Sequence, residues 1–205
     1  MTRMGEFMRK KSHISLAGYL LKSMNLEGLF LHKKAFYFGS ILPDCVPSFI
    51  TRRHSIDETF DILRDEIIKI TDDYEMEKGI TRYYSKHLGV VTHYIADYFT
   101  YPHNRTFTGS MKEHCVYENE LKFALREFVR SEEAAMERAK SAILKTVDEI
   151  LDFIKEMHEE YLKVASKVKV DCTYIVEMCH KVVDAILQIF EENFVNHRLG
   201  QMEAA

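Results

Sequence analysis

Residues that interrupt helices are scarce in this sequence, and that scarcity restricts its fold more than any other feature. Only 8 glycines and 3 prolines occur among its 205 residues. Because glycine and proline are the residues that most often end helices and form turns, their rarity favours a mostly helical chain. Hydrophobic residues make up 46% of the chain, which is enough for a substantial core. We therefore expect an all-α fold, a multi-helix bundle.

The spacing of apolar residues predicts where the helices of the first two thirds lie. Ser55, with Glu58 three residues later, fits the N-cap of a helix. Pro102 is expected to end the helix predicted over 81–101. The segment GSILPDCVP carries one glycine and two prolines and is the clearest loop. The expected helices are 14–24, 55–73, 81–101 and 111–129, with an apolar stretch over 27–42, a loop over 39–47 and a connection over 104–110.

The last third of the chain is expected to form two long, charged amphipathic helices, over 131–165 and 173–195, within a C-terminal region 131–196. Asp171 or Thr173 is expected to cap the second helix. The histidines of this region are expected to be solvated, because they lie among charged residues; they are His158, His180 and His197. The prediction is one all-α domain, residues 1–205, with six or seven helices.

Charge and hydropathy exclude several classes of protein. The net charge of −4 does not suggest a protein held to a polyanion by bulk charge. No run of 18 apolar residues occurs, and the N-terminal stretch lacks the features of a signal peptide. The four cysteines form no CxxC pair, so free thiols are expected. We therefore expect a cytoplasmic location.

Histidines and carboxylates recur at one-turn spacing in the first 118 residues. His93 and Asp97 are four residues apart, and so are His114 and Glu118, which places each pair on one helical face. His103 directly follows Pro102. Facing helices in bundles build metal sites from such pairs, and the ligand types suit Zn²⁺, Mn²⁺ or Fe²⁺. One such pair alone is most often a solvated side-chain contact, so the residues by themselves leave both readings open.

The order of the motifs adds to this pattern. An early His13 is followed by GSILPD, RRH, LGVVTHYIADYFTYPH and HCVYE. This series resembles bacterial zinc-dependent phospholipase C and the related single-strand-specific zinc nucleases, over residues 13–118. The resemblance implies a metal-ligand region at 13–118 that holds up to three zinc ions. Its implied ligands are His13, Asp44, His54, His93, Asp97, His103, His114 and Glu118.

The resemblance also implies how these ligands are divided. One zinc would take Asp44, His54, His93 and Asp97; a second would take His103, His114 and Glu118; a third would take His13 and share Asp97. Asp44 is the implied catalytic general base, acting with a metal-bound hydroxide. In secreted family members an N-terminal tryptophan completes the third site, and this chain has no tryptophan. We expect Met1 or Thr2 to complete that site, or the site to be weakly occupied.

The function implied by the resemblance is hydrolysis of a phosphodiester, in a phospholipid or a related phosphate ester. Peripheral membrane contact fits such a substrate, whereas nucleic acid is a partner only if the chain is nuclease-like. An intracellular phosphodiesterase and a metal-binding protein without catalysis are the other hypotheses, and the oligomeric state stays open. Phosphohydrolases built on an adjacent His-Asp pair are disfavoured because no HD dipeptide occurs.

Other residues near the motifs have simpler expectations. His32 and His87 are expected to be structural or exposed, since His32 has no carboxylate at ligand spacing and His87 lies off the helical face of His93. Arg52 and Arg53 could steer a phosphate, but a surface charge pair is the default. Most aromatic residues around the ligands are expected in the core, with one or two walling a pocket. They are Tyr94, Tyr98, Phe99, Tyr101 and Phe107.

Overall fold

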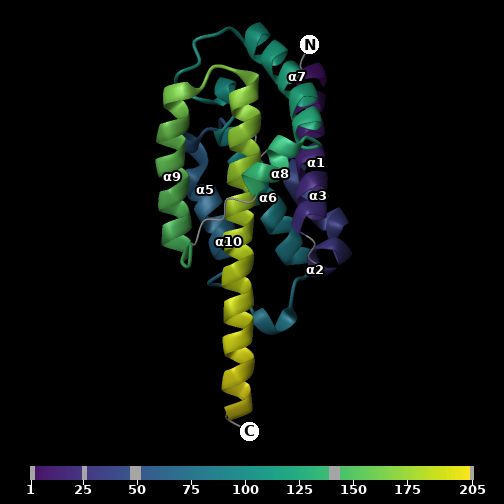
Figure 1. The fold of residues 1–205 in the computed structure, drawn as a ribbon, viewed down its shortest axis with the longest axis vertical. Helices are drawn as coiled ribbons and strands as arrows, with labels where there is room; N and C mark the ends of the chain where they lie inside the picture. Colours follow the sequence, from purple (N-terminus) through teal and green to yellow (C-terminus); the bar gives the residue numbers. More distant parts are fainter. Residues whose placement is uncertain (1–2, 25–26, 47–51, 139–143, 204–205) are drawn as a thin grey trace.

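The computed structural model describes residues 3–24, 27–46, 52–138 and 144–203, and these residues form helices and loops without any strand. Figure 1 shows the helices side by side, with the longest, α10, running the length of the molecule. The prediction of an all-α fold is confirmed. The elements are α1 (Arg3–Met24), α2 (Glu27–Leu31), α3 (Lys33–Ile41), α5 (Ile56–Ile68), η1 (Met76–Lys78), α6 (Arg82–Tyr98), η2 (Tyr101–His103), α7 (Met111–Phe128), α8 (Glu132–Arg138), α9 (Val147–Val164) and α10 (Val168–Glu203).

Helix α6 is the centre of the packing. Nearly all its residues from Tyr84 to Tyr98 are buried, and it contacts α1, α3, α5 and α10. A helix that is buried all round needs apolar or small residues on every face, as LGVVTHYIADY provides. Polar residues on such a helix must find partners inside the protein. Whatever α6 carries is therefore held among other helices and away from bulk water.

Two glycines allow α3 and α6 to approach each other closely. A Cβ atom on Gly39 would lie 2.0 Å from the carbonyl oxygen of Lys86, and one on Gly89 would lie 2.4 Å from the carbonyl oxygen of Phe36. Both distances are far below a van der Waals contact, so only glycine fits at this crossing. The close approach brings the C-terminal end of α3, and the loop that follows it, against the face of α6.

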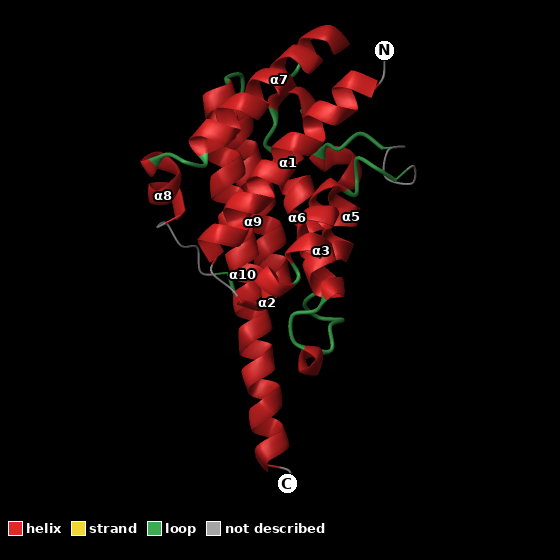
Figure 2. Cartoon of the chain, turned by 90° about the vertical axis from the view of Figure 1, so that its right-hand side faces the viewer, coloured by secondary structure: helices red, strands yellow, loops and turns green. Residues whose placement is uncertain are grey.

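The C-terminal helices α9 and α10 form a second part of the bundle. They lie side by side in Figure 1, and α10 also contacts α1, α6, α7 and α8. The last part of α10 extends beyond the other helices in both views (Figures 1 and 2). Buried apolar side chains from both parts join one contiguous core. Within the described part of the chain, no helix combines the length and hydropathy needed to cross a bilayer.

Local capping explains where several helices begin. The Thr81 hydroxyl accepts a hydrogen bond from the backbone N–H of Tyr84 at the start of α6. Ser110 and Glu113 form a reciprocal capping box at the start of α7. These bonds satisfy N–H groups that a helix leaves unpaired in its first turn. The connection predicted over 104–110 therefore ends where the capping box begins.

Several predicted boundaries in the first half are wrong. Helix α1 begins at Arg3 rather than at residue 14, and residues 39–41 belong to α3 rather than to a loop. The loop occupies residues 42–46, while Pro47 lies outside the described residues. Helix α6 ends at Tyr98, and Pro102 lies inside the short η2 instead of ending α6. Ser55 does precede α5, but Glu58 accepts from the backbone N–H of Arg53 and not from Ser55.

The C-terminal third differs more. The predicted helix over 131–165 is two helices, α8 and α9, because Thr146 caps a new helix through the N–H of Glu149. Helix α10 begins at Val168, so neither Asp171 nor Thr173 caps it. It also continues to Glu203, past the predicted end at 195 or 196. The described residues contain nine α-helices rather than six or seven, since two predicted stretches are each divided.

Candidate metal centre

The eight residues predicted to bind metal come together at one place in the bundle. Four helical elements and two loops supply them: α1, α6, η2 and α7, with the loop after α3 and the residues before α5. All eight side chains are buried except that of His114, which is partly buried. They form three groups whose ligand atoms lie within 4.8 Å of one another: His13, His93 and Asp97; Asp44, His54 and His93; and His103, His114 and Glu118.

Four side chains surround a common point between α6 and the two loops beside it. His54 Nδ1 lies 2.9 Å from Asp97 Oδ2, 3.1 Å from His93 Nε2 and 3.8 Å from Asp44 Oδ1. His93 Nε2 lies 3.2 Å from Asp97 Oδ2 and 3.9 Å from Asp44 Oδ1. Ligands at zinc distances of roughly 2.0–2.1 Å in a tetrahedron lie about 3.3–3.4 Å apart. The separations of these atoms therefore suit a four-coordinate zinc.

The orientation of His93 is set by its other ring nitrogen. His93 Nδ1 lies 2.9 Å from the carbonyl oxygen of Ser40, near the end of α3. A carbonyl oxygen can only accept, so Nδ1 carries a proton and Nε2 is the ring nitrogen that faces the cluster. Metal-binding histidines commonly have such a second hydrogen bond, which fixes the tautomer and the ring plane. The close glycine crossing of α3 and α6 therefore has a direct effect on the site.

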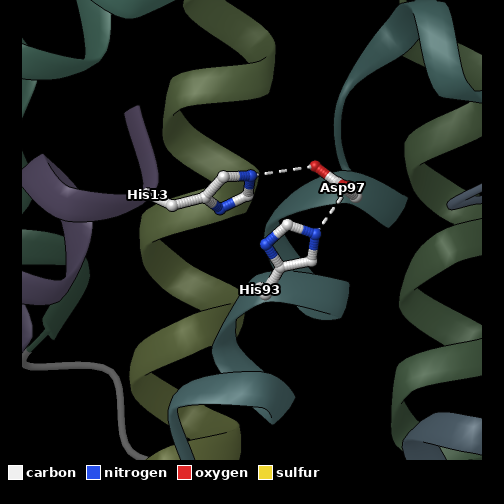
Figure 3. Close-up of side chains that lie close together, drawn as sticks. All are labelled: His13, His93 and Asp97. Carbon is white, nitrogen blue, oxygen red and sulfur yellow. Dashed lines mark ion pairs between the residues drawn. The ribbon is translucent and has the colours of Figure 1, made fainter. Parts of the chain in front are cut away.

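Asp97 divides its two carboxylate oxygens between neighbours. Oδ1 lies 3.3 Å from His13 Nε2, whereas Oδ2 faces His54 and His93 and lies 3.6 Å from His103 Nδ1. Figure 3 shows His13 reaching from α1 toward Asp97 on α6, beside the ring of His93. The two rings are stacked with centroids 4.0 Å apart. A carboxylate placed in this way has one oxygen available to each of two adjacent groups.

The third group lies between η2 and α7. Glu118 Oε1 lies 2.8 Å from His114 Nε2 and 3.2 Å from His103 Nε2. His114 and Glu118 share a face of α7 one turn apart, and Pro102 in η2 turns the chain so that His103 meets them. Three protein ligands are what catalytic zinc sites use, since the remaining position takes water or substrate.

Burial and neighbouring charges set the protonation of the cluster. Burial alone would raise the pKa of the Asp97 carboxyl, but His103 and His93 hold that pKa well below its usual range. Burial and the adjacent His93 lower the pKa of His13. Burial also opposes a proton on His93, but Asp97 and Asp44 outweigh it and raise the pKa of that imidazole. Asp97 is therefore ionised, and His13 favours the neutral form that metals bind.

A further observation also indicates that these ligand atoms fit a zinc ion. Asp44 Oδ2 is buried and accepts no hydrogen bond from the part of the chain that the structure describes. A buried carboxylate oxygen without a partner is costly, and a cation beside it removes that cost. Imidazole nitrogens and carboxylate oxygens together are ligands that zinc accepts readily. The residues present thus fit the metal that the sequence motifs suggested.

The N-terminal ligand expected for the third zinc falls outside what the structure describes, since Met1 and Thr2 are not among the described residues. Helix α1 runs without a break from Arg3 through His13. At about 1.5 Å per residue, this places Arg3 roughly 15 Å along the helix axis from His13. A ligand contributed by Met1 or Thr2 therefore stays a prediction.

The other histidines are mostly buried and paired. His87 contacts Glu66 in the core, which agrees with a structural role, and His32 is half-buried before α3. The prediction that His158 and His180 are solvated is wrong. His158 Nε2 donates to the Asn104 side-chain oxygen at 2.7 Å, and His180 lies 3.4 Å from the Ser23 hydroxyl. Both lie on apolar faces of C-terminal helices whose exposed faces carry the charge.

Exposed residues outside the ligand groups form surface ion pairs. Arg52 pairs with Asp61 at 2.8 Å, with both side chains about half exposed, and His197 pairs with Glu77. Tyr94, Tyr98 and Phe99 are fully buried, while Tyr101 and Phe107 are half-buried.

A small cavity of about 30 Å³ lies beside the ligands and is large enough for a water-sized species. It is lined by Ser12, His13, Ala96, Asp97, Thr100, His103, Glu118, Leu121, Leu125 and Ile175.

Sequence reasoning missed two residues beside the ligands. Ser40 acts through its backbone carbonyl, and no side-chain pattern reveals such a role. Asp171 accepts hydrogen bonds from Tyr101 and Tyr117, which are close in sequence to His103 and Glu118. Asp171 did carry a signal. It stands one turn before Ile175 on the buried stripe of α10, where an acidic residue is out of place.

Comparison with known proteins supports the same assignment. The sequence profile of the family described as zinc-dependent phospholipase C matches residues 12–168. This span includes all eight candidate ligands and most of the chain. Neither the curated proteins nor the solved structures contain a match. The ordered motifs, the buried ligand groups and the extent of the match lead to one conclusion: the chain belongs to the zinc-dependent phospholipase C family.

Proposed function

We propose that this protein is a zinc-dependent phosphodiester hydrolase that acts on a phospholipid or a related phosphate ester. The observation that carries the proposal is the meeting of the ligand groups at Asp97, whose two oxygens face different neighbours. Seven buried ligand side chains and one that is partly buried, arranged in three groups, exceed what a single structural zinc needs. Polynuclear sites of this kind suit phosphoryl chemistry, because adjacent metals can stabilise the attacking and the leaving oxygen.

The ligands would divide as the resemblance implies. Asp44, His54, His93 and Asp97 would hold one zinc, and His103, His114 and Glu118 a second. His13 with Asp97 would contribute to a third. Bound zinc supplies a Lewis acid that polarises phosphoryl oxygens and lowers the pKa of water.

The protein itself supplies orientation and proton transfer. Asp44 is the proposed general base, since its Oδ2 atom is buried near the ligands and accepts no hydrogen bond from the described residues. Ser40 fixes the His93 ring, and Asp97 sets the spacing between adjacent groups. The burial of these groups excludes bulk water, which strengthens their electrostatic effect on a phosphate ester.

The first test combines metal content with activity. Elemental analysis of the purified chain should find zinc, and a soluble chromogenic phosphocholine ester should be hydrolysed in a chelator-sensitive manner. Asp44→Asn should lower kcat by about 10²- to 10⁴-fold, the range for loss of a general base. Asp152→Asn, which changes an exposed carboxylate on α9, is the matched control and should leave the rate unchanged. A wild-type chain that binds zinc but hydrolyses no phosphodiester would support a metal-binding protein without catalysis.

A second arm addresses the alternative substrate. Family resemblance extends to zinc nucleases, so single-stranded DNA should be assayed beside phosphatidylcholine vesicles and the soluble ester. Faster cleavage of the lipid and the ester would support the proposal, with peripheral membrane contact during turnover. Faster cleavage of DNA would replace it with the nuclease-like alternative.

A further inference from the structure

Asp171 joins the C-terminal helices to the candidate metal centre. Its side chain is fully buried in the first turn of α10. Oδ2 accepts a hydrogen bond from the backbone N–H of Tyr101 at 2.8 Å and one from the Tyr117 hydroxyl at 2.9 Å. Oδ1 accepts one from the Tyr161 hydroxyl at 2.7 Å. One carboxylate therefore connects η2, α7, α9 and α10.

Two of these three donors belong to the elements that supply the second ligand group. Tyr101 begins η2, the single turn that carries His103. Tyr117 directly precedes Glu118 on α7 and lies three residues after His114. The ring of Tyr101 also packs against Tyr117, with centroids 5.8 Å apart. Movement of Asp171 would thus displace η2 and α7 relative to each other, and with them the two sides of the ligand group.

A buried carboxylate at this position costs more free energy than a residue that only packs there would. Glu66, a buried carboxylate of the core, pairs with Lys69 and His87. Among the described residues, the hydrogen-bond donors to Asp171 are instead two hydroxyls and one backbone N–H, all neutral. A buried carboxylate without a cation loses much solvation, and well-packed apolar residues often replace buried charges without loss of stability. What a carboxylate offers and an apolar residue does not is the ability to hold three donors in a fixed arrangement.

We infer that Asp171 is a positioning residue for the group formed by His103, His114 and Glu118, and that the C-terminal helices thereby set the zinc affinity of that group. The inference rests on the proposed function, because it requires zinc at this group. Asp171 lies three residues past the end of the family match at 168. Ile175, one turn later on α10, lines the cavity beside the same ligands.

The test measures zinc rather than turnover. The full chain is depleted of metal and titrated with zinc against a chromophoric chelator, and the zinc bound per chain is counted by elemental analysis. His114→Ala serves as the reference for loss of this group alone. Asp171→Ala should lose the same zinc equivalent as His114→Ala, or bind it about 10- to 100-fold more weakly, as for other residues that orient metal ligands. Zinc bound at Asp44, His54 and His93 should remain.

A conservative variant separates positioning from charge. In Asp171→Asn the amide oxygen can still accept from Tyr101 and Tyr117, while the amide nitrogen donates to the hydroxyl oxygen of Tyr161. Asp171→Asn should therefore retain wild-type zinc number and affinity. Equal zinc loss in Asp171→Asn and Asp171→Ala would overturn the inference, as would wild-type affinity in both. If Asp171→Ala does not fold, the tyrosine variants below carry the test.

Two tyrosines provide a matched pair. Tyr117→Phe and Tyr161→Phe each remove one hydroxyl bonded to Asp171, but the first lies beside a ligand and the second lies on α9. Both variants should lower the melting temperature by a similar amount. Tyr117→Phe should weaken zinc binding severalfold more than Tyr161→Phe does. Equal zinc effects would mean that Asp171 acts only on stability. A wild-type chain that binds no zinc at this group overturns the proposed function; a zinc-binding wild type with unaffected variants overturns only the positioning role.

Discussion

The helices that carry the candidate ligands and the C-terminal helices bury different kinds of side chain. Helix α6 buries His87, His93 and Asp97 among its apolar residues. Helix α9 and the first two thirds of α10 bury mainly aliphatic residues, including Ile150, Ile154, Val182 and Ile186, with Asp171, His158 and His180 as the polar exceptions. Each aliphatic side chain stabilises the fold by about 1.5–3 kcal/mol through burial, whereas buried ionisable groups gain little unless they are paired.

This difference teaches that the two regions depend on different forces. The ligand region concentrates ionisable side chains, which repel one another or lose solvation when they are buried. A bound cation offsets this cost and stabilises the folded region. The C-terminal region supplies apolar burial that offsets this cost. It reaches the ligand region through Asp171, which accepts hydrogen bonds from Tyr101 and Tyr117, and through Ile175, which lines the cavity beside the ligands. Substitutions in the first region should alter metal binding first, and those in the second should alter stability first.

The largest expected effect comes from Asp97→Ala. This change removes the carboxylate that contacts His13, His54 and His93, so at least one zinc should be lost. Hydrolysis of the phosphocholine ester should fall by about 10³-fold or more, because a catalytic metal is worth several kcal/mol of transition-state stabilisation. Elemental analysis and initial rates measure both. Asp65→Ala, an exposed carboxylate on α5, is the control. Full zinc content in Asp97→Ala would remove Asp97 from the ligand set.

Stability should respond most strongly to a cavity in the C-terminal core. Ile154→Ala or Ile186→Ala removes a fully buried side chain and should lower the free energy of unfolding by about 2–5 kcal/mol. Zinc bound per folded chain should not change, because neither side chain is among the residues that line the cavity beside the ligands. Urea unfolding and elemental analysis of the same samples test this, with the half-exposed Val164→Ala as control. Loss of zinc in step with stability would contradict the division between the two regions.

Among the described residues, two carboxylates outside the ligand groups are buried, Glu66 and Asp171, and they should respond to pH with opposite signs. Burial opposes ionisation of Glu66, but His87 and Lys69 outweigh it and lower its pKa, so its stabilisation is present above the unfolded pKa and lost as the pH falls through the folded pKa. Burial raises the pKa of Asp171 to about 6 despite its hydrogen bonds. Its stabilisation is present below the unfolded pKa and is lost as the pH rises to about 6.

The experiment compares unfolding free energies of zinc-depleted Glu66→Gln and Asp171→Asn with the wild type at pH 4 and pH 7. Glu66→Gln should lose more stability at pH 7 than at pH 4. From pH 4 to pH 7, the free energy of unfolding of Asp171→Asn relative to the wild type should rise by on the order of 2 kcal/mol. Shifts of the same sign in both variants would show that the two carboxyls do not differ in the way their partners suggest.

The smallest effect is expected at the exposed link between the regions. Arg105, just past η2, pairs with Glu159 on α9 at 3.1 Å, with both side chains more than half exposed. Exposed ion pairs contribute little, so Arg105→Gln should change the free energy of unfolding by less than about 1 kcal/mol and leave zinc affinity unchanged. Thermal melts in low and high salt measure the first, and zinc titration the second. An effect on zinc comparable to that of Asp171→Ala would show that either contact can position the ligands.

Local signals in the sequence predicted part of this structure well. One-turn spacing placed His93 with Asp97 and His114 with Glu118, and the connection predicted over 104–110 ends where α7 begins, because helical geometry depends on nearby residues. The motif order also brought the eight candidate ligands together, and the structure does place them in adjacent groups. Their role as zinc ligands stays a prediction until metal is measured.

Tertiary contacts account for what the sequence could not predict. His158 and His180 resemble solvated residues locally, but their partners, Asn104 and Ser23, are 54 and 157 residues away. Asp171 fits the local description of a helix cap, yet its three donors come from other elements. Polar partners that distant leave no periodic trace in the sequence. The same holds for Ser40, whose backbone carbonyl orients His93.

The crossing of α3 and α6 has a consequence for how this protein tolerates sequence change. Gly39 and Gly89 have no functional group, yet any side chain at either position meets backbone of the other helix. A substitution there would separate the helices, and the Ser40 carbonyl would move away from the His93 ring. In a complete survey of substitutions, these two positions should therefore be as intolerant as the histidines themselves. A search for functional positions by reactive side chains alone would pass over both.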